Sequence, residues 1–223
     1  MTSSKPTSTT VPALNAELRA LVRLAGAICG SSTSVVRTTL EDAVRSVRPV
    51  WAEEVILQSY LFAGFPRTLN AMREWRRASG RAVQADALVE NWDDVAEWTR
   101  RGEETCRAVY GSHYEKLREN IRALHPALDA WMITEGYGKV LSRGALDLLV
   151  RELCIVAACA VSGQERQLRS HLLGARNVGA SASQIEGTLD AIADLMSERD
   201  AREAKSLWQR LQVVVLGDPN SSP

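Results

Sequence analysis

Residues 146–161, LDLLVRELCIVAACAV, decide the fold of this chain. The stretch is apolar on nearly every side, and its charges are confined to Asp147 and the neighbours Arg151 and Glu152. A helix that is hydrophobic all round lies in the interior of a protein, because a surface helix keeps one polar face. We therefore expect a central, buried helix here that is interrupted at Gly163.

Helical signals continue along most of the chain. The predicted helices have apolar residues at helical spacing between capping or breaking residues. They cover about 13–29, 34–47, 52–78, 91–110, 112–125, 126–135, 164–178 and 181–211, and the last of these ranges is one helix or a pair. The third should kink near 64–66, where Gly64 and Pro66 interrupt it. No segment gives a convincing strand signal. The expected fold class is all-α.

Local signals mark several ends of these helices. Asn91 is an expected N-cap. Ser112 and Ser181 are each followed three residues later by Glu or Gln, which is a capping-box signature. The run Gly136-Tyr137-Gly138 predicts a turn.

The layout of the chain also contains a weak internal repeat. Residues 21–63 and 149–195 both contain an apolar helix, a break and a second helix. We predict a disordered tail at 1–12, a diverged N-terminal helical module at 13–80, connecting helices at 81–143, a C-terminal module at 144–212 and a tail at 213–223.

Bulk composition excludes several functions. Lys plus Arg equals Asp plus Glu, at 27 each, so no general affinity for nucleic acid or an anionic membrane is expected. Residues 1–12 contain no apolar run, so we expect no secretory signal, and no stretch approaches the ~18 apolar residues of a membrane span. The four cysteines (Cys29, Cys106, Cys154 and Cys159) form no CxxC or zinc pattern. We expect buried, reduced thiols in a cytoplasmic protein without a metal.

Residues 151–189, RELCIVAACAVSGQERQLRSHLLGARNVGASASQIEGTL, resemble the core of the carboxymuconolactone decarboxylase family, which includes the alkyl hydroperoxidase D type. The stretches 101–114 (RGEETCRAVYGSHY) and 137–147 (YGKVLSRGALD) are similar to the lead-in of its decarboxylase branch, and 53–71 to the helix that closes the module. The resemblance implies an all-α fold of tandem helical hairpins. It also implies homo-oligomers, commonly trimers or hexamers, with pockets near subunit contacts.

The thiol-dependent branch of that family uses a Glu, two Cys three apart, and a His four further on. Glu152 and His171 match the Glu and the His, but Gln164 and Gln167 occupy the two Cys positions. Glutamine cannot form a thiolate or a disulfide, whereas the decarboxylase branch needs neither. This chain also has SRGALD at 142–147 where SRPGLD is usual, and the missing proline bears on pocket shape and substrate.

The matched residues can supply acid/base chemistry. An antiparallel hairpin turning at Gly163 can bring Glu152 to His171, and a carboxylate beside an imidazole fixes its tautomer for proton transfer. We predict these two as the catalytic residues. The predicted substrate-binding residues are Gln164 and Gln167 as oxyanion donors, Arg151 and Arg169 for carboxylates, and Tyr137.

This arrangement suits cofactor-free decarboxylation of a small carboxylated lactone such as γ-carboxymuconolactone. A non-catalytic oligomeric binding or assembly protein that keeps the fold is the alternative, and Glu152 with His171 would then be only a buried polar pair. A thiol peroxidase is a third possibility, against which the missing cysteines argue. The expected partners are a second copy of the chain and a small-molecule acid. In the first repeat Leu24 and Ala43 roughly occupy the positions of the catalytic pair, which predicts no acid/base site there.

Overall fold

The computed structural model describes residues 14–83 and 94–216, and these ranges contain helices and no strand. The helices are α1 (Ala16–Gly30), α2 (Thr33–Ser46), α3 (Pro49–Gln58), α4 (Tyr60–Ser79), α5 (Val95–Tyr110), α6 (Tyr114–Leu124), α7 (Pro126–Trp131), α8 (Leu148–Val161), α9 (Glu165–Asn177), α10 (Ala182–Ala191) and α11 (Glu198–Leu216). Short 3₁₀ helices lie at Gly111–His113 and Ala193–Leu195, and a π-helix, η2, at Met132–Leu141. The predicted all-α fold class is confirmed. Within the described ranges, no helix is both long and apolar enough to cross a bilayer.

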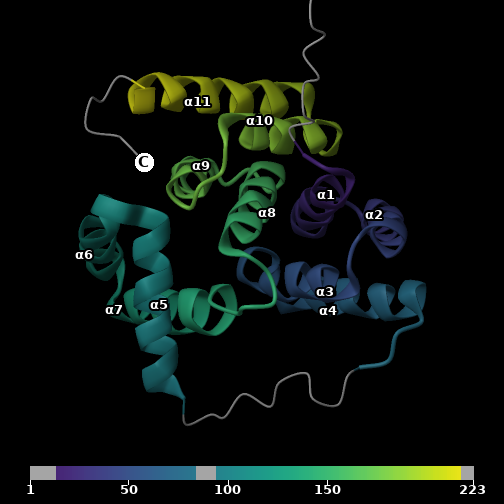
Figure 1. Cartoon of the computed structure of the whole chain (residues 1–223), viewed down its shortest axis with the longest axis horizontal. Helices are drawn as coiled ribbons and strands as arrows, with labels where there is room; N and C mark the ends of the chain where they lie inside the picture. Colours follow the sequence, from purple (N-terminus) through teal and green to yellow (C-terminus); the bar gives the residue numbers. More distant parts are fainter. Residues whose placement is uncertain (1–13, 84–93, 217–223) are drawn as a thin grey trace, which may run out of the picture.

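Helix α8 lies in the middle of the molecule, with α1 on one side and α9 on the other (Figure 1). Every residue from 150 to 160 is buried, as the composition of this stretch predicts. Because α8 is enclosed on all sides, the charged side chains of Arg151 and Glu152 must find partners on neighbouring helices rather than in water.

Two helical hairpins, α1–α2 and α8–α9, meet where α1 packs against α8. In each hairpin, an arginine of the first helix binds the helix that follows the other hairpin. Arg151 on α8 binds Glu54 on α3, and Arg23 on α1 binds the carbonyl of Ala191 at the end of α10. This reciprocal contact ties the two hairpins together.

Several predicted helix boundaries are confirmed, and others lie at different residues in the structure. The capping box of Ser181 with Gln184 is present, and the expected break lies at Gly64, whose φ is 74°. The segment predicted at 52–78 is two helices, and the first begins at Pro49, which suits the first helical position because proline lacks an N–H. Helix α11 runs beyond the predicted end at 211. The expected N-cap Asn91 lies outside the described residues.

Two local predictions are wrong. The run Gly136-Tyr137-Gly138 is not a turn but lies inside the π-helix. Ser112 does not cap α6, because Gly111–His113 form a 3₁₀ turn in which the amide of Tyr114 bonds the carbonyl of Gly111. That backbone bond takes the place of a side-chain cap.

Gly138 of the π-helix allows that helix to pack closely against α5. A Cβ at Gly138 would lie 1.9 Å from the carbonyl oxygen of Trp98, and one at Gly102 would lie 2.1 Å from that of Ile133. Both are far below van der Waals contact, so the two backbones approach only because neither residue has a side chain. This contact fixes where the aromatic residues at the end of α5 and on the π-helix lie.

Replacing Gly138 with alanine should therefore destabilise the fold by about 2–3 kcal/mol, because overpacking outweighs the usual helical gain of alanine. Gly136 is the matched control, because a Cβ there would meet nothing within 4 Å. Gly136→Ala should be neutral or slightly stabilising. Urea unfolding of both variants measures the difference, and equal free energies of unfolding would show that the close contact is unnecessary.

Candidate active site

The structure brings the predicted acid/base pair together. Nδ1 of His171 lies 2.8 Å from Oε2 of Glu152, across 19 residues of sequence. Glu152 is fully buried and His171 is 6% exposed. The turn at Gly163, with φ of 70°, folds α9 back against α8 and brings the two side chains together. Because the carboxylate is the acceptor, a neutral imidazole here carries its proton on Nδ1 and presents the Nε2 lone pair.

The other carboxylate oxygen of Glu152 has no hydrogen-bond partner among the described residues, although it is buried. Leaving such a group unsatisfied costs on the order of 1–3 kcal/mol, so an orphaned oxygen calls for a functional explanation. Gly174 on α9 makes room for this carboxylate, since a Cβ there would lie 2.8 Å from Oε2. The fold thus leaves one buried oxygen of Glu152 without a hydrogen-bond donor among the described residues.

Aromatic side chains surround the imidazole. The rings of Phe62 on α4 and Tyr110 on α5 each lie 6.3 Å from that of His171, at 84° and 65° to it. Tyr137 on the π-helix lies 6.2 Å from Tyr110, ring centre to ring centre. Phe62 and Tyr110 are half-buried, whereas Tyr137 is buried. The half-buried rings of Phe62 and Tyr110, which contact the buried imidazole, mark the side from which a ligand would reach Nε2.

The guanidinium of Arg151, one of the predicted carboxylate anchors, already has its hydrogen-bond partners within the protein. This group is fully buried, lies 2.7 Å from Oε2 of Glu54, and donates to Gln58 and to the carbonyls of Arg143 and Leu146. Arg143 also binds Glu54, at 2.8 Å. Burial raises the pKa of the Glu54 carboxyl, but the two arginines outweigh it and hold that pKa below its ordinary value. The geometry favours a structural role for Arg151, which ties α8 and the loop before it to α3.

The other predicted substrate-binding residues divide between two places. Tyr137 contacts the ring of Tyr110, which in turn contacts the imidazole of His171. Gln164, Gln167 and Arg169 are exposed, and none of these three described side chains hydrogen-bonds either member of the pair. Their role in binding stays a prediction.

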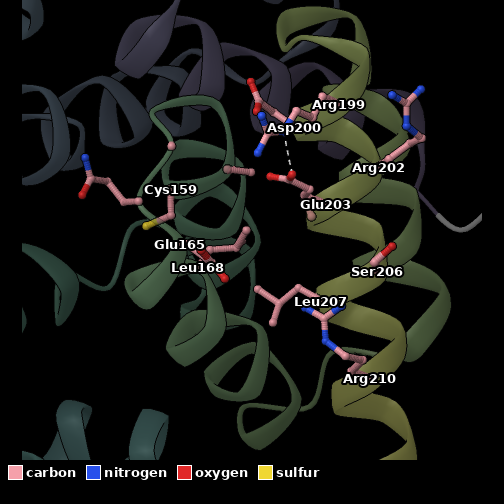
Figure 2. A pocket seen from close by; sticks show the side chains of 14 residues that line it. Cys159, Glu165, Leu168, Arg199, Asp200, Arg202, Glu203, Ser206, Leu207 and Arg210 are labelled. Atoms are coloured by element: carbon pink, nitrogen blue, oxygen red, sulfur yellow. Dashed lines mark hydrogen bonds and ion pairs between the residues drawn. The ribbon is translucent and has the colours of Figure 1, made fainter.

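A separate groove of about 690 Å³ lies between α9 and α11 (Figure 2). Gln164, Cys159 and Leu168 line it from the α8–α9 side, and charged residues of α11 line the opposite side. Some of those charges pair along α11 itself, as Arg199 does with Glu203. Glu152 and His171 do not line this groove, so it is distinct from the site built around the imidazole.

The four cysteines are free and buried. Burial raises the pKa of Cys29, Cys106 and Cys154 to about 12, and that of Cys159 above its ordinary range. The thiolate is the reactive form, so raised pKa values make these thiols poor nucleophiles. Among the described residues, no group of three or more His, Cys, Asp or Glu is arranged to hold a metal ion.

The folded protein should therefore resist thiol reagents. A pKa of about 12 in place of 9.0 lowers the thiolate fraction of Cys154 about a thousandfold at neutral pH. We expect Ellman's reagent to modify all four thiols rapidly in urea but only very slowly in the native state. Formation of a Cys154–Cys159 disulfide on treatment with peroxide would contradict this prediction and revive the peroxidase alternative. Mass spectrometry would detect it as the loss of two hydrogens.

Two tandem helical hairpins, with a buried Glu–His pair on one of them and glutamines at both cysteine positions, define a class: an alkyl hydroperoxidase D-like fold without the CxxC. The carboxymuconolactone decarboxylase family model matches residues 126–204, from the start of α7 into α11. The chain thus contains a domain of the carboxymuconolactone decarboxylase family at 126–204. Tyr137, Glu152 and His171 lie within this domain, whereas Phe62 and Tyr110 lie outside it.

A fungal protein is similar over most of the chain. Peroxisomal protein 2 of Schizosaccharomyces pombe is 26% identical over 167 residues, which cover 74% of this chain and 78% of that protein. The similarity therefore extends well beyond the 126–204 domain.

Sequence reasoning missed two residues of the site. The only signal for Tyr110 was its place in the family-like stretch 101–114, where it reads as the end of a helix before Gly111. Phe62 lies just before the interruption at Gly64, and no motif in the sequence there distinguishes it from a packing residue. Both reach His171 through tertiary contacts that no local pattern encodes.

Proposed function

We propose that this chain is a cofactor-free decarboxylase of a small carboxylated lactone, such as γ-carboxymuconolactone, with Glu152 and His171 as its acid/base pair. The observation that best supports this is the buried 2.8 Å contact between the two, with one oxygen of Glu152 left without a partner. Its position inside a carboxymuconolactone decarboxylase family domain supports the same reaction.

The reaction needs an electron sink and a proton. When the bond to the departing CO₂ breaks, its electron pair moves through the double bond to the lactone carbonyl and forms an oxyanion. A hydrogen-bond donor stabilises that oxygen. Protonated His171 then delivers a proton from Nε2 to carbon, while Glu152 stabilises the imidazolium through Nδ1. The lactone itself takes up the electron pair, so the chemistry requires neither a metal nor an organic cofactor.

The surroundings of His171 suit a flat, unsaturated ring. Phe62 and Tyr110 stand edge-on to the imidazole and leave aromatic surface for the ring to pack against. The orphaned oxygen of Glu152 repels a second carboxylate, so any such group of the substrate should point outward, toward the exposed side of α9 that carries Arg169.

A binding or assembly role remains the alternative, and exposed apolar residues favour it. Phe65 on α4 and Trp131 on α7 are each 63% exposed, which is unusual for large aromatic side chains. Self-association through such residues stays a prediction, as does a cytoplasmic location. The name of the yeast relative makes the peroxisome the alternative compartment.

The first test is turnover of γ-carboxymuconolactone, generated in situ and followed by ultraviolet absorbance. His171→Ala should lower kcat by about 10²–10⁴-fold, because it removes the proton donor. Arg169→Ala serves as a comparison that should raise KM more than it lowers kcat. Circular dichroism and light scattering of each variant check that fold and assembly are unchanged.

Wild-type turnover that survives in His171→Ala would overturn the assigned role. Absence of turnover by a well-folded wild-type protein would instead favour another substrate or the binding role.

A further inference from the structure

The groove between α9 and α11 has an apolar floor. Leu168 of α9 and Leu207 of α11 are buried and line it, and the small residues Cys159, Ala160 and Ala204 complete the floor. The volume of about 690 Å³ lies within the range of roughly 300–1,000 Å³ that is typical of small-molecule sites. A floor of this kind favours a ligand with an apolar body, because binding removes apolar surface from water.

The groove follows the length of α11 (Figure 2). Four of the residues of α11 that line it are successively four, three and four positions apart, and they therefore lie along one face of the helix: Arg199, Glu203, Ser206 and Arg210. At a rise of about 1.5 Å per residue, this stripe is roughly 16 Å long. The site is thus elongated, which suits an extended chain better than a compact ring.

Most charges that α11 contributes to the groove already have a partner. Arg199 pairs with Glu203 at 2.8 Å. Arg202 pairs with Glu198 at 3.4 Å. Asp200 accepts a hydrogen bond from the hydroxyl of the serine that precedes the helix. These charges are therefore largely compensated within α11 and the residue before it.

Arg210 is the exception on α11. Its exposed guanidinium makes no hydrogen bond or ion pair with a described residue, and Figure 2 shows it near Leu207, on the side of α11 that faces α9. The charge on the other wall is Glu165, in the first turn of α9, where the positive end of the helix dipole stabilises a carboxylate. The groove therefore carries an uncompensated positive charge at one end of an apolar floor.

We propose that this groove is a second binding site, which takes a linear carboxylic acid with its chain on the apolar floor and its carboxylate on Arg210. A guanidinium can donate two parallel hydrogen bonds to a carboxylate, so the match is geometric as well as electrostatic. A ligand with a single charge fits best, because the carboxylates of Glu165 and Glu203 border the groove and repel a second one. Neither Glu152 nor His171 lines the groove, so this site is independent of the proposed decarboxylation.

The test uses dansylaminoundecanoate, a fluorescent fatty acid whose emission rises and shifts to shorter wavelength in an apolar site. Its titration into the full-length protein is compared for the wild type, Arg210→Gln and Arg210→Lys. Arg19→Gln is the matched control, because the guanidinium of Arg19 is also exposed and makes no hydrogen bond or ion pair with a described residue, but it lies on α1. His171→Gln reports whether the probe enters the site around the imidazole instead.

We expect saturable binding of one probe per chain by the wild type. Arg210→Gln should weaken it about tenfold, because the carboxylate loses its charged donor. Arg210→Lys should weaken it less, because lysine keeps the charge but not the paired hydrogen bonds. Arg19→Gln and His171→Gln should bind as the wild type does. Absence of saturable binding by the wild type, equal affinity in Arg210→Gln, or an equal loss in either control would each overturn the proposal.

Displacement of the probe tests the head group. Decanoate should displace it about tenfold better than decanol, which has the same chain and no charge. Decyl phosphate, which carries a second charge at about pH 8, should also compete less well than decanoate. Equal displacement by decanol would remove the role of Arg210, and stronger displacement by decyl phosphate would contradict the assignment of a carboxylate.

Discussion

The burial of α8 on all sides is the constraint on which the other features depend. Two opposite charges, Arg151 and Glu152, are adjacent in sequence on a helix that offers them no water. Arg151 is met by Glu54, by Gln58 and by backbone carbonyls, so its hydrogen bonds are complete and it fastens α8 to α3. Among the residues that the structure describes, Glu152 hydrogen-bonds only His171, and only through one oxygen. Arg151 thus has a structural role, while Glu152 keeps an oxygen without a partner beside an imidazole, an arrangement that acid/base chemistry can use.

The internal repeat shows why a single hairpin carries this pair. Leu24 and Ala43, which the predicted repeat places roughly at the positions of Glu152 and His171, are fully buried in the apolar core. The first hairpin therefore packs without a polar pair, and it contributes the α1 surface that covers α8. Residues between and beside the hairpins supply the rest of the site: Phe62 from α4, Tyr110 from α5 and Tyr137 from the π-helix.

Much of the fold could be predicted from sequence because its signals are local. The all-round hydrophobicity of 146–161 identified the central helix, and Ser181 with Gln184 identified the start of α10. The pairing of Glu152 with His171 followed from the hairpin and from the family-like motif. Prediction failed where tertiary contact overrides local preference. Glycines flanking Tyr137 normally signal a turn, yet Gly138 allows a π-helix to pack directly on α5. The sequestration of Arg151 depends on Glu54, which is 97 residues away in the chain and has no sequence signal linking it to α8.

The central claim is that Glu152 orients His171 with the proton on Nδ1 and leaves Nε2 for the substrate. Nitrogen-15 NMR of histidine-labelled protein tests this directly, at a pH where the imidazole is neutral. The chain has three histidines, and His171→Gln assigns the signal. We expect the Nδ1–H tautomer in the wild type. In Glu152→Gln the side-chain amide can donate to Nδ1, so the population should shift toward the Nε2–H tautomer. An Nε2–H tautomer in the wild type, or no change in Glu152→Gln, would contradict the account.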